Sequence, residues 1–480
     1  MSTAATAVIP TFRKLASGAA QLAGGQVIRR GLRMLTMFVA ARWLGPAQFG
    51  IYVLLVAMTE MLALITGGGY LDYLTREAVQ LPQSAGWIAT RLSLVRFAYT
   101  AAGAILILGG LRLLHYDGRI IAFAAVMIGS LYPRTILECS YGLARGSQHF
   151  AKVPLLEGIH AGTLFLVAVA LLWKGWGLAS VVAAELISCA LAAVIGVVLT
   201  RSAWERRVHT GWDIRELFQR TIAFNVFPFI VNAYDRADVF VLSKLASTAA
   251  VGIYGLSYRI FAGVGIVPYG IMGAILPVLS ESAWNRDKEQ LCSTAMRLMY
   301  SIALLAILAV MLLANPLVPA LLGHAYGDSA TVLQILIWST IPIYLNYTLN
   351  ATLLSSGNER IFILTALVCM IFNLAANIVL VPRYSYFAAA AVTIATECVL
   401  LGQNLFFVAR KLGQVPLPKR VAGLTLSFGL ILAFGMVADR LGAPRIPVGI
   451  VGLGLFIAYV MVDNPYRLVG FRQIAASKAQ

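Results

Sequence analysis

Apolar segments long enough to cross a bilayer, separated by short polar turns, run through this chain from one end to the other. Backbone polar groups find no water in hydrocarbon, so such segments can span a membrane only as helices or as a closed barrel. About 20 consecutive apolar residues are typical of a helix. Charged residues make up 12% of the sequence, against about 25% in soluble domains. We therefore predict an all-α polytopic membrane protein with about 14 transmembrane helices. The predicted spans are residues 18–43, 49–68, 88–113, 120–144, 153–173, 177–200, 219–243, 250–279, 292–316, 330–355, 361–382, 385–409, 421–438 and 446–462.

A sequence repeat divides these spans into two six-helix bundles and an appended helix pair. FVAARWLGPAQFGIY at 38–52 is similar to FVLSKLASTAAVGIY at 240–254, at a constant offset of 202 residues. The offset covers six spans, an even number, so the two units share one orientation. The predicted boundaries are 1–200 for the N-terminal bundle, 201–218 for a cytoplasmic linker, 219–410 for the C-terminal bundle, and 411–480 for helices 13 and 14 with a cytoplasmic tail.

Basic residues are distributed unequally between the two sides of the predicted membrane. With the N-terminus inside, the cytoplasmic loops and tail contain 20 Lys and Arg residues and the opposite loops contain eight, when the outermost two residues of each span are counted with the adjoining loop. Because Lys and Arg are enriched in cytoplasmic loops, we expect both termini in the cytoplasm.

Several functional classes lack their motifs here. The net charge of +17 does not come from a soluble basic patch, so we expect no nucleic acid as partner, and the loop charges are expected to contact membrane lipids. There is no GxxxxGK[ST] loop, no HExxH pair and no nucleophile motif. The five histidines show no metal-ligand spacing, and the five cysteines are scattered in apolar segments. We therefore expect no enzyme, no cofactor and no metal. Residues 1–15 lack the apolar region of a cleaved signal peptide.

Arginine recurs inside the apolar spans, at Arg29, Arg30, Arg33, Arg96, Arg134, Arg236 and Arg259. A guanidinium stays charged at any accessible pH, and placing it at the bilayer centre costs at least roughly 2.5 kcal/mol. These side chains must therefore face a protein interior or a watery cavity. A cavity with fixed positive charge favours an anionic ligand, and the sequence thus indicates transport of an anionic molecule.

The first span holds three of these arginines. Gln26, Arg30 and Arg33 fall on one helical stripe, with Arg29 beside it. At about 1.5 Å rise per residue, Arg33 lies too deep for easy snorkelling. We expect these side chains to face a central cavity and to hold phosphate through bidentate hydrogen bonds. The alternative is pairing with an intramembrane acid such as Glu60.

Two further arginines have open alternatives. Arg134 and Glu138 are four residues apart on the fourth span, just after Pro133, so they form either a structural ion pair on their own helix or part of a substrate site. Arg96 lies deep in the third span and is a second candidate for cavity exposure.

The seventh span is the most polar helix. Asn225, Asn232 and Arg236 share one face. Asp235 and Asp238 lie on a neighbouring face, toward the outer end. A carboxylate in such a place can bind a proton or sodium ion, with its affinity set by the adjacent arginine. The alternative is an Asp–Arg lattice that only neutralises itself. The candidates for ion coupling are Asp235, Asp238, Glu60 and Glu138.

An aromatic stripe follows the eighth span at Tyr254, Tyr258, Phe261, Gly265 and Tyr269, with Arg259 beside it. Such rings either stack on sugars or simply pack between helices. The candidate substrate-binding residues are Arg29, Arg30, Arg33, Arg96, Arg134, Asn225, Asn232, Arg236, Tyr258 and Arg259. Interhelical hydrogen bonding is the default expectation for the other polar groups in spans, which are Glu157, His160, Glu185, Asn346, Asn350, Asn373, Asn377, Glu397 and Gln403.

Two segments carry a family resemblance. Residues 43–55 are WLGPAQFGIYVLL, and their distinctive positions are Leu44, Gly45, Pro46, Phe49, Gly50 and Tyr52. Residues 234–260 are YDRADVFVLSKLASTAAVGIYGLSYRI, and their distinctive positions are Arg236, Asp238, Val251, Gly252 and Tyr254. Both segments resemble motifs of the polysaccharide transporters of the MOP superfamily, the Wzx-type flippases. The predicted arrangement of two bundles and a helix pair agrees with that family along essentially the whole chain.

The resemblance implies a flippase of the bacterial inner membrane. Its substrate would be an undecaprenyl-pyrophosphate-linked oligosaccharide repeat unit for exopolysaccharide, capsule or O-antigen assembly. It implies alternating access coupled to a proton or sodium gradient, with a polysaccharide polymerase as partner. The alternatives are a drug/cation antiporter of the same superfamily and a peptidoglycan-precursor lipid flippase. A membrane glycosyltransferase would need a long outer loop, which this sequence lacks. About nine basic residues against seven acids in the spans favour an anionic cargo.

Overall fold

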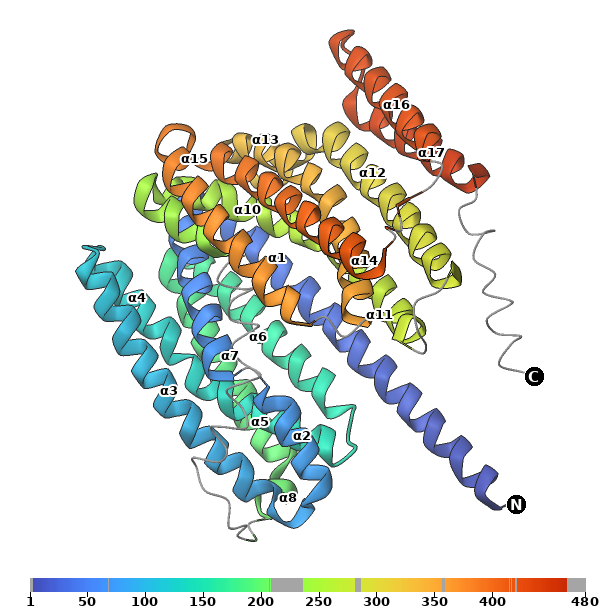
Figure 1. Cartoon of the computed structure of the whole chain (residues 1–480). Coiled ribbons are helices and arrows are strands. Elements are labelled where there is room, and N and C mark those ends of the chain that lie inside the picture. The colour runs from blue at the N-terminus through green and yellow to red at the C-terminus, as the bar shows by residue number, and fades with distance from the viewer. Residues whose placement is uncertain are drawn as a thin grey trace. The chain divides into compact units, whose positions relative to one another are not determined.

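The computed structural model describes residues 3–67, 69–206, 208, 236–280, 286–355, 359–413, 415, 417–418 and 421–463. These residues form helices joined by turns and contain no β-strand (Figure 1), which confirms the predicted all-α fold. Ten stretches of described helix are long and apolar enough to cross a membrane. The number of fourteen spans stays a prediction, because most of the span at 219–243 lies outside the described residues.

The chain divides into two compact units, Met1–Arg236 and Ala237–Gln480. The finer boundaries predicted for the bundles, the linker and the tail remain predictions.

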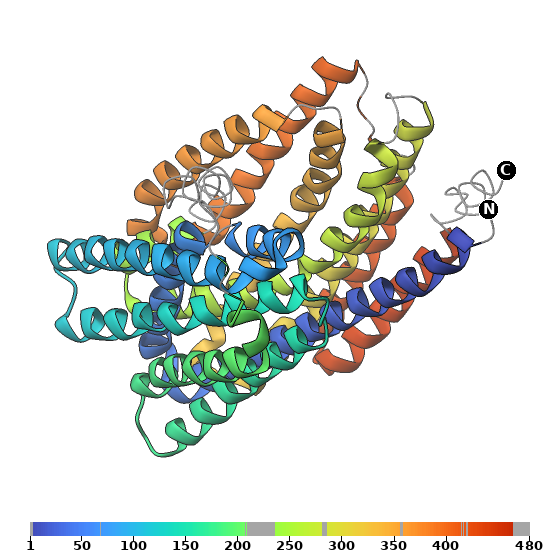
Figure 2. The same ribbon diagram turned by 90° about the horizontal axis from the view of Figure 1, so that it is seen from below.

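The N-terminal unit is a set of antiparallel helices. Its elements are α1 (Thr3–Gly67), α2 (Tyr70–Gln80), the 3-10 helix η1 (Pro82–Ser84), α3 (Ala85–Leu113), α4 (Gly118–Gly129), α5 (Leu131–Gly146), α6 (Lys152–Trp173), α7 (Leu178–Leu199) and the short α8 (Arg201–Trp204). With 22 residues each, α6 and α7 are about 33 Å long, enough to cross a hydrocarbon core of about 30 Å. α3 and α4 lie side by side across a short turn (Figure 2), and α6 packs against both α1 and α7.

The turn between the first two predicted spans lies inside α1. Gly45 leaves the helical conformation there, at φ 70° and ψ 170°. A positive φ carries no steric cost for glycine. Pro46 follows directly, and its fixed φ and missing N–H suit the first position of a helix. The Leu-Gly-Pro string therefore forms the turn between two helical segments of α1. The geometry of this turn explains why Gly45 and Pro46 occur there.

The C-terminal unit begins with residues 237–245 of a helical stretch that starts at Arg236. It continues with α10 (Thr248–Val264), α11 (Ile266–Ser280), α12 (Arg286–Leu322), the 3-10 helix η2 (His324–Tyr326), α13 (Gly327–Leu336), the 3-10 helix η3 (Ile337–Ser339), α14 (Thr340–Ser355), α15 (Glu359–Leu412), α16 (Ala422–Arg440) and α17 (Arg445–Asp463). Within α15, Ser385 breaks the helix at a φ of 51°, so the two predicted spans form separate helical segments.

Two predicted spans are interrupted helices. α4 and α5 meet at Ser130, and α10 and α11 meet at Gly265. In each case a proline, Pro133 or Pro268, follows the break by three residues. A proline has no N–H to bond the carbonyl four residues before it, so the helix can break in that turn.

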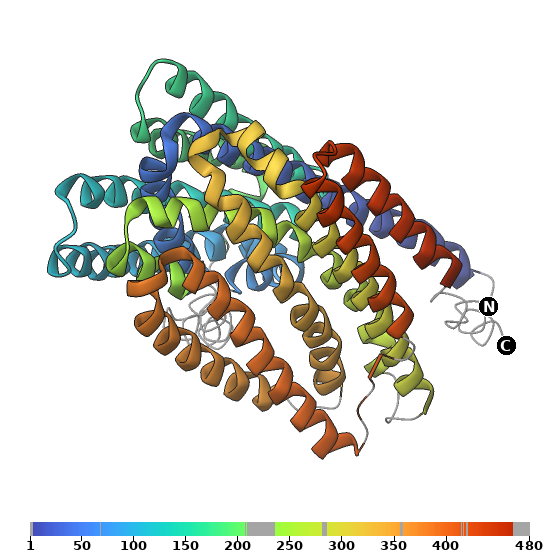
Figure 3. The same ribbon diagram turned by 90° about the horizontal axis from the view of Figure 1, so that it is seen from above.

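The appended helices α16 and α17 pack against each other and along α12 (Figure 3). An ion pair fastens them there, because a guanidinium nitrogen of Arg297 on α12 donates to the carboxylate of Asp463 at the end of α17. Arg297 is 4% exposed. Arg297, which the sequence places near a cytoplasmic helix end, thus serves as a structural contact between α12 and α17.

Candidate functional site

Arg29 lies on the face of α1 that packs against α6. Its Nη2 donates to Gln26 Oε1 at 2.7 Å, and its Nε lies 3.6 Å from Glu157 Oε1. Gln26 Nε2 donates to the same carboxylate at 3.4 Å. Gly25 permits this close approach, because a Cβ at that position would lie 2.4 Å from the Cβ of Pro154. Glu157 thus neutralises Arg29 where the two helices are closest.

Arg33, one turn further along α1, pairs with α7 instead. Its Nη2 donates to Glu185 Oε1 at 2.8 Å. The predicted stripe of Gln26, Arg30 and Arg33 is therefore divided. Arg29 and Arg33, four residues apart, face α6 and α7, whereas Arg30 is turned away by about 100° per residue and is exposed.

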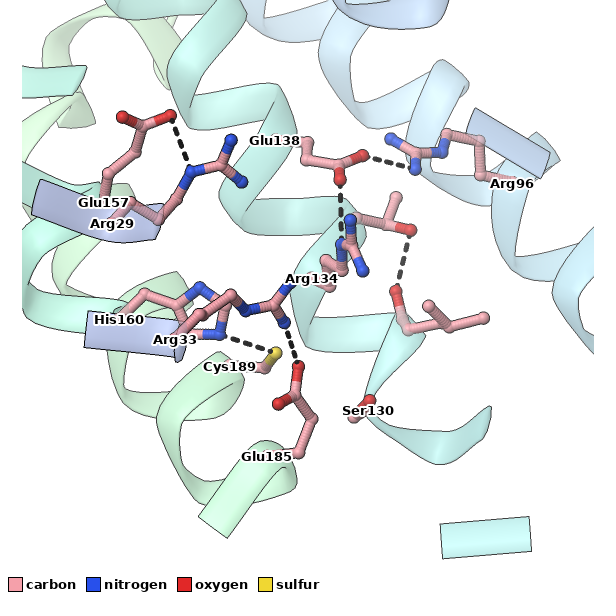
Figure 4. A network of polar contacts seen from close by, with 12 residues as sticks. Arg29, Arg33, Arg96, Ser130, Arg134, Glu138, Glu157, His160, Glu185 and Cys189 are labelled. Atoms are coloured by element: carbon pink, nitrogen blue, oxygen red, sulfur yellow. Dashed lines mark hydrogen bonds and ion pairs between the residues drawn. The ribbon is translucent and has the colours of Figure 1, made fainter. Parts of the chain in front are cut away.

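Glu138 on α5 serves two arginines (Figure 4). Arg134 Nε donates to its Oε1 at 3.0 Å, four residues away on the same helix, and Arg96 Nη2 on α3 donates to its Oε2 at 2.6 Å. The ion pair considered for Arg134 and Glu138 is thus present. Arg96 is 4% exposed, so it is a buried partner of Glu138 and does not line an open surface of its unit.

Arg236, the last residue of the N-terminal unit, forms an ion pair with Glu60. Its Nη2 donates to Glu60 Oε2 at 2.6 Å. Glu60, considered as a partner for the first-span arginines, therefore pairs with Arg236.

These pairs leave a surplus of positive charge. Five guanidinium groups, of Arg29, Arg33, Arg96, Arg134 and Arg236, are paired with four carboxylates, of Glu60, Glu138, Glu157 and Glu185. Among the described residues, Arg96 and Arg134 thus share one carboxylate, that of Glu138. A group of side chains with a net positive charge attracts anions in general.

The exposed fraction of each side chain shows whether the arginine or the glutamate of a pair is accessible. The side chains of Arg29 and Arg33 are 31% and 33% exposed, whereas their partners Glu157 and Glu185 are 5% and 8% exposed. Arg134 is 26% exposed. In the pairs of Arg29 and Arg33 the cation is thus the more accessible partner, whereas Arg96 (4%) and Arg236 (15%) are less exposed than their partners Glu138 (22%) and Glu60 (27%). An accessible guanidinium can form bidentate hydrogen bonds with a phosphate.

Asp238 is the one candidate of the seventh span with described contacts in the C-terminal unit. It is 4% exposed and accepts a hydrogen bond from Tyr254 Oη, which lies 3.3 Å from Thr393 Oγ1 on α15. Asn225, Asn232 and Asp235 lie outside the described residues.

The aromatic stripe of the eighth span is packed ring against ring. The Tyr258 ring centroid lies 5.8 Å from that of Tyr254 and 5.9 Å from that of Phe261. Arg259 is half-buried beside them. These contacts fit helix packing, the alternative to sugar stacking. Gly265, predicted as part of the stripe, instead marks the break between α10 and α11.

Interhelical hydrogen bonds engage most of the other polar groups. Asn346 Nδ2 donates to Glu397 Oε2 at 3.3 Å and accepts from Asn404 Nδ2 at 3.0 Å. Asn373 Nδ2 donates to Thr396 Oγ1 at 3.3 Å. These contacts join α14 to α15 and the two segments of α15 to each other, as expected from the sequence.

One cluster was not expected from the sequence. His160 on α6 and Glu185 and Cys189 on α7 bring a nitrogen, an oxygen and a sulfur within 4.8 Å of one another, and all three residues are buried. The sequence interpretation found no metal-ligand spacing among the histidines. The i, i+4 spacing of Glu185 and Cys189 was the available signal, but the histidine comes from another helix.

Fold and site define the class: a multi-pass membrane protein with the fold of the MOP-superfamily transporters. The fold is similar to that of a structure titled lipid II flippase MurJ, inward closed conformation (TM-score 0.71, 13% identity, 92% of this chain and 99% of that chain). It is also similar to an inward-facing multidrug resistance MATE family transporter (TM-score 0.65, 13% identity, 81% of this chain and 98% of that chain).

Residues 15–283 match the family described as polysaccharide biosynthesis protein, and residues 225–379 match the MatE family. Since the first match covers more than half of the sequence, the chain belongs to the polysaccharide biosynthesis protein family. "Probable flippase AglR" of Haloferax volcanii is 22% identical over 414 residues, which are 79% of this chain and 80% of that protein. The resemblance to the polysaccharide transporters of the MOP superfamily is thereby confirmed.

Proposed function

We propose that this protein is a flippase that moves an undecaprenyl-pyrophosphate-linked oligosaccharide repeat unit across the bacterial inner membrane. The product would serve exopolysaccharide, capsule or O-antigen assembly. The observation that carries the proposal is the surplus of guanidinium groups over carboxylates, with Arg29 and Arg33 more exposed than their acidic partners. A pyrophosphate is the anionic part of such a substrate, and arginine binds it in a bidentate manner.

The ion pairs supply a reason for reversible binding. An uncompensated guanidinium at membrane depth is costly. In the resting site, Glu157 and Glu185 compensate Arg29 and Arg33. When a pyrophosphate takes over these arginines, the carboxylates lose part of their attraction. When it leaves, the pairs re-form. Neither state leaves Arg29 or Arg33 as a bare cation, so the substrate need not be held so tightly that it cannot be released.

Coupling to a proton or sodium gradient belongs to the same proposal. The candidate carboxylates are Glu60, Glu138, Asp235 and Asp238. Glu60 and Glu138 are directly paired with arginines of the cluster. Protonation of either one would change the net charge that a pyrophosphate encounters.

Leaflet accessibility of a labelled lipid-linked oligosaccharide in proteoliposomes tests the function. We expect Arg33→Gln combined with Arg134→Gln to reduce the initial rate about tenfold or more, since each charge-assisted hydrogen bond contributes roughly 1.5–3 kcal/mol. Arg201→Gln is the matched control, because that arginine is 79% exposed and pairs with Glu205, the residue directly after α8. An unchanged rate in the double variant would count against the cluster as the substrate site.

The same vesicles separate the alternatives. An opposing proton or sodium gradient tests the coupling. Competition by a peptidoglycan precursor that displaces the oligosaccharide substrate would favour the precursor-flippase alternative. Transport of organic cations instead would favour the drug/cation antiporter, which the surplus of arginine over glutamate disfavours. A polysaccharide polymerase is the partner expected to consume the product on the outer side.

A further inference from the structure

His160, Glu185 and Cys189 bring together a nitrogen, an oxygen and a sulfur atom between α6 and α7 (Figure 4). Each of these atoms can bind a metal ion. His160 Nε2 lies 3.3 Å from Cys189 Sγ, and Glu185 carries its carboxylate one turn before that cysteine. His160 is 7% exposed, Glu185 6% and Cys189 0%. These residues therefore meet inside the protein.

We propose that these three side chains bind a divalent cation of the zinc class. In a tetrahedral zinc site with Zn–S about 2.3 Å and Zn–N about 2.0 Å, a sulfur and a nitrogen ligand are about 3.5 Å apart. The 3.3 Å between Cys189 Sγ and His160 Nε2 is close to that value. A carboxylate oxygen of Glu185 within 4.8 Å of both atoms can complete three protein ligands with a small side-chain movement. The fourth position would remain open to water.

The metal must compete with Arg33 for the same carboxylate. Glu185 Oε1 now accepts from Arg33 Nη2 at 2.8 Å. The cation would bind the thiolate of Cys189, so its thiol proton leaves for solvent. Binding therefore adds the two positive charges of the metal to the site and leaves one negative charge on the Cys189 sulfur. The two anionic ligands neutralise the metal, and Arg33 loses its carboxylate.

This competition gives the site a regulatory consequence that depends on the proposed function. Arg33 is 33% exposed, and it becomes an uncompensated cation when the metal holds Glu185. A bound metal should therefore raise the affinity of the arginine cluster for a phosphorylated anion. By linkage, the anion should raise the affinity for the metal by the same factor.

Cobalt titration of the full-length protein in nanodiscs tests the site, since Co²⁺ reports thiolate ligation by a charge-transfer band and tetrahedral geometry by visible ligand-field bands. We expect one equivalent of Co²⁺ to produce both, and Zn²⁺ to displace it. Cys189→Ser should remove the charge-transfer band, and His160→Gln should weaken binding more than roughly tenfold. Cys139→Ser is the matched control, because Cys139 is also buried but contacts Ser93 at 3.3 Å.

A further variant separates ligation from nonspecific thiol binding. Arg33→Gln removes the competitor for Glu185 and should tighten cobalt binding, whereas binding to an isolated thiol would not change. Absence of a charge-transfer band in the wild-type protein, or its equal loss in Cys139→Ser, would overturn the proposal. These spectra need no transport, so a failed metal site and a failed flippase assignment are distinguishable. Pyrophosphate titration with and without Zn²⁺ then tests the linkage alone.

Discussion

At the scale of single residues, Glu138 is the central charge of the N-terminal unit. It accepts from Arg134 at 3.0 Å and from Arg96 at 2.6 Å. Arg96 is buried, so it cannot turn to water when its partner is lost. Breaking a buried ion pair costs more than the pair itself contributes, because a bare charge remains.

We expect Glu138→Gln to destabilise the protein by about 3–5 kcal/mol. The comparison is Glu205→Gln, which removes the partner of the exposed Arg201 and should change stability little. Denaturation in detergent micelles, followed by circular dichroism, measures both. Adding Arg96→Met to Glu138→Gln should recover part of the loss. A Glu138→Gln protein as stable as the wild type would contradict the structural role of this carboxylate.

The sequence predicted only part of this cluster. The four-residue spacing of Arg134 and Glu138 predicts an ion pair on one helix. The contact of Arg96 with Glu138 joins two helices, as does that of Arg33 with Glu185. Periodicity on one helix does not reveal which neighbour it faces. The surplus of arginine in the spans was visible in the sequence, but the shared carboxylate was not.

At the scale of helices, α1 approaches α6 where glycine replaces a side chain. A Cβ on Gly25 would lie 2.4 Å from Pro154 Cβ and 3.2 Å from Glu157 Oε2, whereas one on the neighbouring Gly24 would meet nothing within 4 Å. The first of these distances is too short for any real contact with a rigid proline ring.

Gly25→Ala should therefore separate α1 from α6, at a cost of about 1–3 kcal/mol for overpacking. Gly24→Ala, the adjacent control, should be neutral or stabilising by up to about 1 kcal/mol, because alanine favours helix over glycine. Thermal unfolding of the two variants provides the comparison. Equal behaviour of the two variants would mean that the helices do not meet at this glycine.

Helix limits were predictable to different degrees. The Gly45–Pro46 turn falls between the first two predicted spans, because both residues have strong backbone preferences. The breaks at Ser130 and Gly265 divide spans that hydropathy treats as continuous. Hydropathy measures only apolar content, so it does not detect an interruption that keeps the segment apolar. A proline three residues later is the signal that marks both breaks.

At the scale of the whole molecule, the connections of the N-terminal unit lie at two ends. Gln48, which follows the Gly45–Pro46 turn, lies near Gly177, since a Cβ on Gly177 would be 3.1 Å from Gln48 Oε1. At the other end, the backbone N–H of Gly86 donates to the carbonyl of Arg206 at 3.0 Å. Turns that the predicted topology assigns to one side are thus neighbours. Which end faces the cytoplasm remains a prediction from the charge distribution.

Cysteine labelling decides the orientation. In a variant without the five native cysteines, Gln48→Cys should react with an impermeant maleimide in intact cells. Glu205→Cys should react only after permeabilisation, because positively charged loops are retained in the cytoplasm. Both positions are exposed, so both cysteines should react with the maleimide after permeabilisation. The reverse pattern would invert the predicted topology.

The contact between Arg297 and Asp463 has a consequence for biogenesis. The neutralising acid is encoded 166 residues after the arginine, so α17 must be synthesised to its end before this cation acquires its anion. During that interval, α12 carries an unbalanced charge inside the translocon or the lipid. Premature termination before Asp463 would make this unbalanced state permanent.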